Sequence, residues 1–409
     1  MIIGLDTLQD FDPMLHHDPP DIRREVFLNT GAACGLLVDA FSKLPNLRNV
    51  GLRDYDGNGR LRDGERAKWR SYGWSMGGTR NHSRQLYASP GPMLPILLFA
   101  LGKASVRPTN LEAFLRRRRM PDCSFDLSCL QLDVAPVLSG LRTLLLSLDD
   151  AQMGISRPGT VTGHDHLQAF LKYTPLLEHL RLNFTNQPAI PPGDRGTEGF
   201  LRWFGAPSGV AGSAKIGPAP ISLDHLTALD LGMLCVTPKT LLQVVSKYAK
   251  LKALSLWKVN LQCLGDRGVN PDCLWDSCLS KIGKAFQAPE DVSTVMIGFA
   301  GEVTRFHITE VKFAGKVSVD GNGEKKFEDP EGKASYRKRV GSNVKGWFED
   351  LGKRAFIEKP DFHDDSDDSE DDEDDDGEDA EDDDSEDAEV DDGELNENGG
   401  GEADVLVLD

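Results

Sequence analysis

The sequence predicts an α/β fold in which short strands alternate with helices, and three observations lead to it. First, an apolar residue, two variable residues, an apolar residue, one variable residue and a third apolar residue recur along the chain. Second, segments with helical apolar spacing lie between these matches. Third, the chain has 409 residues, of which 39% are hydrophobic, so it is long enough to bury a sizeable core.

The recurring pattern predicts the strands. Five segments match it in full: Leu47, Val50 and Leu52; Leu141, Leu144 and Leu146; Leu177, Leu180 and Leu182; Leu226, Leu229 and Leu231; and Leu251, Leu254 and Leu256. The last three positions of each match alternate as in a strand with one buried face. A sixth match, at Leu111 and Phe114, fails at Arg116, and looser matches begin at Val292 and Ile308.

Helices are predicted between the strands, over residues 164–173 and 238–249, from their apolar spacing. Thr237 followed by Pro238 is a good helix opening, with Thr as the N-cap. A strand-helix unit of this kind cannot bury both faces alone, whereas stacked units share one core. We therefore predict an irregular leucine-rich-repeat solenoid over residues 44–315, with a generic α/β domain as the alternative.

Other segments complete the predicted organisation. Residues 1–43 form an amino-terminal segment with a capping helix over 21–44, and residues 187–220, rich in Pro and Gly, form an exposed insertion. Residues 316–359 hold a hairpin, around the Asp-Gly-Asn-Gly at 320–323, and a basic amphipathic helix with an apolar stripe from Tyr336 to Leu351.

The last segment, residues 360–409, is predicted to be a disordered acidic tail. From residue 361 onward it contains 28 of the 66 acidic residues and no Lys or Arg, which leaves the preceding residues with a net charge of +8. It has too few apolar residues to offset the entropy of ordering. Ser366, Ser369 and Ser385 lie among Asp and Glu and are phosphorylation candidates, and we expect basic partners such as histones.

The cysteine content and the hydropathy of the chain indicate the cellular compartment in which it resides. Seven Cys with no CxxC pair exclude a disulfide framework and favour a reducing compartment. The chain begins without a signal-like segment, and its longest apolar run is too short to span a bilayer. We expect a monomeric cytoplasmic or nuclear protein that does not enter a membrane.

Sites for chemistry are scarce in this sequence. Residues 54–65 fit the twelve-residue calcium loop, with Asp54, Asp56, Asn58 and Glu65 as candidate ligands. A strand pattern replaces the entering helix, however, and Arg60 and Arg62 place positive charge beside the ion, so a polar loop is favoured. We find no zinc spacing, phosphate loop or nucleophile motif, and we expect neither a cofactor nor an enzyme.

The segments 44–54, 173–182 and 251–256, which read LPNLRNVGLRD, YTPLLEHLRL and LKALSL, resemble the leucine-rich-repeat region of fungal F-box proteins. In that family an amino-terminal F-box docks onto a cullin-RING ubiquitin ligase while the repeats hold a substrate. Residues 1–24 contain no recognisable F-box, so ligase docking is in question.

The resemblance implies a non-catalytic protein-binding surface. The variable strand positions predict its contact residues, namely Glu178, Arg181, Asp230, Lys252 and Ser255, which we expect to be exposed. The alternative is a nuclear acidic chaperone that binds histones through the tail, because repeats followed by a long acidic tail are similar in layout to leucine-rich acidic nuclear phosphoproteins.

Overall fold

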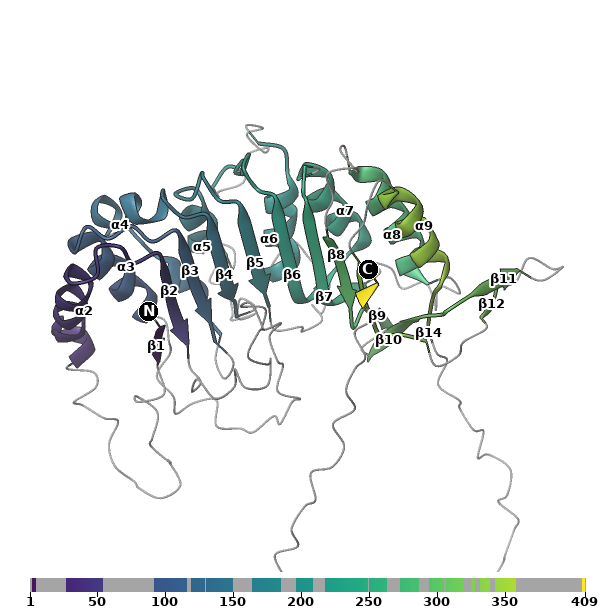
Figure 1. The fold of residues 1–409 in the computed structure, drawn as a ribbon, viewed down its shortest axis with the longest axis horizontal. Helices are drawn as coiled ribbons and strands as arrows, with labels where there is room; N and C mark the ends of the chain where they lie inside the picture. Colours follow the sequence, from purple (N-terminus) through teal and green to yellow (C-terminus); the bar gives the residue numbers. More distant parts are fainter. Residues whose placement is uncertain are drawn as a thin grey trace, which may run out of the picture.

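A mixed α/β architecture with a mostly parallel sheet is seen in the computed structural model (Figure 1). The structure describes residues 2–4, 27–53, 92–115, 119–128, 130–149, 164–184, 196–208, 218–248, 250–262, 273–286, 294–304, 307–319, 325–327, 332–338, 343–357 and 407–408. None of the helices in these ranges is long and apolar enough to cross a membrane.

Eight strands pair in chain order, each parallel to the next. They are β1 (Ile2–Gly4), β2 (Asn49–Arg53), β3 (Asn110–Phe114), β4 (Thr143–Ser147), β5 (His179–Asn183), β6 (Ala228–Val236), β7 (Ala253–Gln262) and β8 (Thr294–Gly298). The strands predicted from the five full matches and from the looser match at Val292 are confirmed. Their pattern residues form continuous rows across the sheet, one of which is Val50, Leu111, Leu144, Leu180, Leu229, Leu254 and Val295.

Helices line one face of this sheet (Figure 1). They are α2 (Ala32–Ser42), α3 (Met93–Lys103), α4 (Gln131–Leu138), α5 (Asp165–Leu171), α6 (Gly196–Gly205), α7 (Pro238–Lys247), α8 (Leu274–Ala285) and α9 (Val344–Lys353), with the short 3₁₀ helix η3 (Asp122–Phe125) before α4. The pattern leucines are buried against them in one core, each burial contributing roughly 1.5–3 kcal/mol. Thr237 caps α7 as predicted, its hydroxyl accepting a hydrogen bond from the Thr240 amide at 3.3 Å.

The carboxyl-terminal strands change direction. They are β9 (Gly301–Thr304), β10 (His307–Phe313), β11 (Val317–Val319), β12 (Lys325–Phe327), β13 (Ser335–Lys338), β14 (Ala355–Ile357) and β15 (Val407–Leu408). β13 is antiparallel to β8, and β10 is antiparallel to both β9 and β14. The predicted hairpin is confirmed, because β11 and β12 pair antiparallel.

Several expectations need correction. Residues 187–220 are not simply an exposed insertion, because α6 lies within them and buries Phe200, Leu201 and Phe204. The predicted helix from Tyr336 is wrong in its first part, because Tyr336 lies in β13, where it pairs with Ile297 of β8. The helix begins only at α9, whose N-cap is Asn343.

Three further corrections concern the capping helix and the matches at Leu111 and Ile308. The capping helix expected over 21–44 is interrupted: residues 27–29 are helical, and α2 starts at Ala32 after a left-handed Gly31, while residues 21–26 lie outside the described part. The match at Leu111 was read in the wrong register, because Ala113 and not Arg116 aligns with Leu146. The match at Ile308 lies in β10, which is antiparallel and leaves Ile308 exposed, so it is no unit of the parallel series.

Three neighbouring strands carry a bulky residue in the left-handed region of backbone conformation. Met233 (φ 56°), Lys258 (φ 53°) and Phe299 (φ 49°) each directly follow the aligned residues Gly232, Trp257 and Gly298. A residue other than Gly costs about 1–2 kcal/mol in this conformation. The sheet therefore stores local strain along one line across β6, β7 and the end of β8.

Candidate functional site

The five predicted contact residues come from three neighbouring strands. Arg181, Asp230 and Ser255 align directly across β5, β6 and β7, on the sheet face opposite the pattern leucines. Glu178 and Lys252 lie just before β5 and β7. The structure thus brings the predicted residues to one region of the polar sheet face.

Their expected exposure is only partly correct. Arg181 and Ser255 are buried, with 4% and 5% of their surface exposed, and the Asp230 side chain is 14% exposed. Lys252 is exposed and Glu178 is half-exposed. Glu178 and Lys252 are therefore accessible to solvent, whereas the side chains of Arg181, Asp230 and Ser255 are largely enclosed by the fold.

Arg181 and Asp230 form a tightly bonded charge cluster with His179. The Arg181 Nε and Nη2 atoms donate to Asp230 Oδ2 at 2.9 and 2.6 Å, and His179 Nε2 lies 3.0 Å from the same oxygen. Burial by itself raises the pKa of Asp230, but the bond from His179 and the charge of Arg181 outweigh it, so this pKa lies below its ordinary value. Asp230 is therefore ionised at neutral pH and holds the Arg181 guanidinium against the sheet.

A second buried ion pair lies on the same face two strands away. Arg53 Nη2 at the end of β2 contacts both oxygens of Glu112 on β3, at 3.0 and 3.2 Å, and both side chains are less than 10% exposed. Replacing one partner of such a pair leaves an uncompensated buried charge. These pairs make the polar face rigid rather than adaptable.

Among the described residues the Ser255 hydroxyl has no hydrogen-bond partner, although Asp230 and His179 lie on the same face. A serine nucleophile needs a base within hydrogen-bond distance of its oxygen. His179 instead bonds to Asp230, so the described residues do not arrange Ser255 as an activated nucleophile.

A row of residues runs along the amino-terminal edge of β2 to β7, and we call it the edge row. Each member directly precedes a strand, and from the second member on its backbone amide donates a hydrogen bond to the carbonyl of the member before it. The members are Arg48, Thr109, Arg142, Glu178, Thr227 and Lys252. Arg48, Arg142 and Lys252 are exposed, and the other members are half-exposed. Within the row Arg142 forms an ion pair with Glu178, with side chains 54% and 46% exposed. Five of these residues directly follow the first leucine of a full pattern match, so their position could have been predicted from the sequence. Of them, only Glu178 and Lys252 were among the predicted contact residues.

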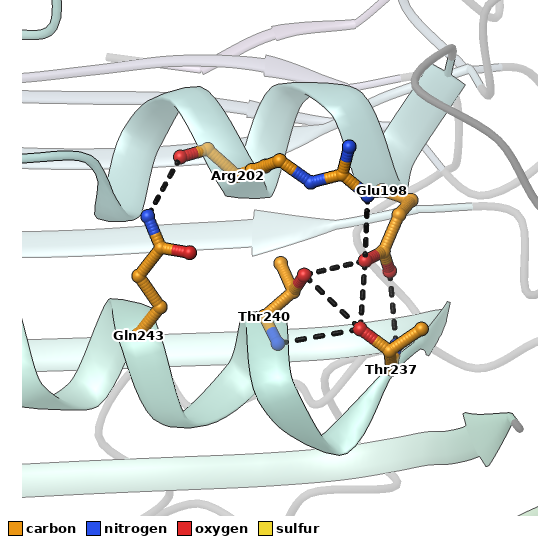
Figure 2. A network of polar contacts seen from close by, with 5 residues as sticks. All are labelled: Glu198, Arg202, Thr237, Thr240 and Gln243. Atoms are coloured by element: carbon orange, nitrogen blue, oxygen red, sulfur yellow. Dashed lines mark hydrogen bonds and ion pairs between the residues drawn. The ribbon is translucent and has the colours of Figure 1, made fainter. Parts of the chain in front are cut away.

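A separate network connects α6 to α7 through the buried Glu198 (Figure 2). One carboxylate oxygen accepts from the Thr237 amide at 2.9 Å, and the other accepts from the Thr237 hydroxyl at 2.8 Å and from the Thr240 hydroxyl. The amino terminus of a helix has unpaired amides and a partial positive charge, so a carboxylate stabilises it. Glu198 thus joins one helix to the start of the next.

The same arrangement occurs at two other helices. Asp122 of η3 accepts from the amides of His166 and Leu167 at the start of α5, and Glu302 of β9 accepts from the Trp275 amide at the start of α8. The pKa of Asp122 and that of Glu302 both lie above their ordinary values, because burial raises them more than the bonds from the helix amides lower them. Together with Glu198 we call them the capping carboxylates.

No protein-family model matches the chain, and no curated protein matches it either. The site must therefore be interpreted from its residues.

The remaining predicted residues lie outside the described part of the chain or gain no partners in it. The calcium candidates Asp54, Asp56, Asn58 and Glu65, and the phosphorylation candidates Ser366, Ser369 and Ser385, fall outside the described residues. Among the residues that the structure does describe, no group of three or more His, Cys, Asp or Glu side chains could hold a metal.

Proposed function

We propose that the chain is a leucine-rich-repeat solenoid that binds a partner protein and performs no catalysis itself. The parallel order of β1 to β8 supports a stack of strand-helix units, because each strand adds to the last in the same register. The recurrence of pattern leucines in continuous rows supports it further.

The observation that carries the functional proposal is the edge row. It offers exposed charged side chains at regular strand spacing of about 4.8 Å, next to a polar face held by the buried pairs Arg181–Asp230 and Arg53–Glu112. Rigid presentation of charged side chains lowers the entropy lost on binding. A partner segment lying across the strands can contact several members at once.

The charge of the edge row indicates the partner's chemistry. Arg48 and Lys252 are exposed cations at the two ends of the row, and Arg142 and Glu178 form a pair between them. We infer a partner with acidic groups opposite Arg48 and Lys252. By the resemblance to fungal F-box proteins, this partner would be a ligase substrate, with cullin-RING components as further partners.

The test compares surface variants of the full chain in affinity purification from a fungal extract. Arg48→Glu with Lys252→Glu reverses the edge row, and Lys172→Glu with Lys239→Glu reverses two exposed lysines at α5 and α7 with the same change in net charge. We expect the first variant to lose a partner that wild type and the second variant retain.

Equal recovery by all three proteins would refute the edge row as the binding surface. Cullin-RING components in the retained set would support the adaptor assignment, and their absence from every sample would refute it.

The acidic segment favours a second candidate function, a nuclear histone-binding chaperone. Its 28 carboxylates without a Lys or Arg suit a strongly basic partner. Histone binding should then fall with salt and disappear when residues 361–409 are deleted, while reversal of the edge row should leave it unchanged. Histone binding that survives this deletion would exclude the chaperone function.

A further inference from the structure

The carboxyl-terminal end of the folded body bears a set of exposed lysines, which we call the lysine cluster. They are exposed rather than fully accessible, the Lys325 side chain being 37% exposed. They lie on α8, on α9 and on or next to the β11–β12 hairpin; they are Lys281, Lys284, Lys316, Lys325, Lys326, Lys345 and Lys353. The edge row lies elsewhere, before the parallel strands, so the two surfaces are distinct.

The elements that carry the lysine cluster are neighbours. Helices α8 and α9 pack together, and Lys284 of α8 lies 4.0 Å from Glu349 of α9. Lys325 of the hairpin forms an ion pair with Asp276 of α8. Figure 1 shows both helices and the hairpin at the same end of the sheet.

Most of this positive charge is not neutralised by the residues that the structure describes. Lys281, Lys316, Lys326, Lys345 and Lys353 make no ion pair with the residues that the structure describes. Unpaired cations on adjacent elements repel one another and produce a positive field that attracts an anionic segment. The cluster therefore fits an acidic chain better than a neutral one.

The chain supplies such a segment next to the cluster. Acidic residues without any Lys or Arg begin at residue 361, four residues after β14 ends at Ile357. The far end of the segment also returns, because Val407 and Leu408 in β15 pair in parallel with Arg337 and Lys338 of β13. Attachment at both ends raises the local concentration of carboxylates around the cluster, so even weak contacts are occupied.

We propose that the lysine cluster is the docking surface for this chain's own acidic segment, residues 361–404. Docking rests on many long-range attractions rather than on fixed pairs, because the 27 carboxylates of residues 361–404 exceed the cations that they face. The contact is intramolecular and sensitive to salt. It is independent of the proposed function at the edge row, so either can fail without the other.

The test is zero-length cross-linking of the full chain with a carbodiimide, which joins lysine amines to carboxylates in contact, followed by mass spectrometry. We expect segment carboxylates to be joined mainly to cluster lysines. The yield should fall about fivefold or more between 0.01 M and 1 M salt, since the Debye length shortens from about 30 Å to about 3 Å. A mixture of unlabelled and nitrogen-15 chains shows whether both partners come from one molecule.

Charge variants sharpen this test. Lys281→Glu, Lys326→Glu and Lys345→Glu together should lower the yield at the remaining lysines of the cluster about threefold or more, because the attraction weakens. The matched control reverses the exposed Lys172, Lys239 and Lys250 and should leave that yield unchanged. Circular dichroism verifies that both variants fold.

Three outcomes would overturn the proposal. The first is cross-links spread evenly over all exposed lysines, and the second is an equal effect of the two triple variants. The third is a preponderance of links between labelled and unlabelled chains, which would place the acidic segment on a second copy.

Discussion

Replacing Glu198 tests whether a buried carboxylate stabilises the start of α7. Glu198→Ala leaves the Thr237 amide without its acceptor, and a buried unpaired donor costs about 1–3 kcal/mol. The two hydroxyl bonds to Glu198 are charge-assisted, at about 1.5–3 kcal/mol each, but the several kcal/mol of carboxylate desolvation offset them. The Thr237 and Thr240 hydroxyls also keep their mutual contact at 3.1 Å. With a small cavity added, we expect a net loss of about 2–4 kcal/mol.

The assay is equilibrium unfolding in urea, followed by tryptophan fluorescence. With an m-value of about 3 kcal/mol/M, the midpoint of Glu198→Ala should fall by about 1 M while m stays constant. Glu198→Gln keeps the shape but cannot accept from every donor, so a smaller loss of about 1–2 kcal/mol is expected.

The matched control is Gln243→Ala, in the same network (Figure 2). Gln243 donates only a long bond of 3.4 Å to the Arg202 carbonyl, and its loss should change stability by less than about 0.5 kcal/mol. A Glu198→Ala variant as stable as wild type, or no less stable than Gln243→Ala, would refute the assigned role of Glu198.

Three other predictions concern buried or strained residues. Asp230→Asn leaves the buried Arg181 charge without its carboxylate and should lower stability by about 3–5 kcal/mol in calorimetry; a loss below 1 kcal/mol would contradict the charge cluster. Burial lowers the pKa of His164 to about 4 from an ordinary value near 6.5, so its stabilisation is complete above pH 6.5 and is lost as the pH falls toward 4. Wild type should therefore lose about 3 kcal/mol more over that window than His164→Leu in urea unfolding at several pH values, and parallel curves would exclude a titrating His164. Lys258→Gly should be about 0.5–1 kcal/mol more stable than Lys258→Ala in thermal unfolding, because Gly adopts positive φ without strain; the opposite order would refute strain at this position.

The strands of the fold were predictable because alternation of apolar and variable residues indicates a strand with one buried face, independently of which strand pairs with it. The register of β3 was missed because Ala113 is small, so the pattern was aligned on Leu111 and Phe114, three residues too far along the chain. The helix was predicted to start at Tyr336 because apolar residues recur every three or four positions from there to Leu351. This spacing continues from β13 into α9 and does not reveal the boundary between them. The better signal was Asn343, whose side chain accepts from the Gly346 amide at 3.0 Å as an N-cap.

The candidate site was less predictable than the strands. Alternation indicated that Arg181 and Ser255 lie on the polar face, but it does not indicate whether that face is open to water. Helix α6 was hidden by the surrounding Pro and Gly, although Phe200, Leu201 and Phe204 have helical spacing. The capping carboxylates could not be found from sequence, because each acts on a helix about 40 residues away or, for Glu302, on one that precedes it.

The capping carboxylates determine how the molecule responds to a pulling force applied at its two ends. Helices that only touch would detach one after another, each at a low force. Because Asp122, Glu198 and Glu302 hold the first turns of α5, α7 and α8, detaching one of these helices also exposes a buried carboxylate and the amides that it caps. The chain should then lengthen in a few large steps rather than many small ones.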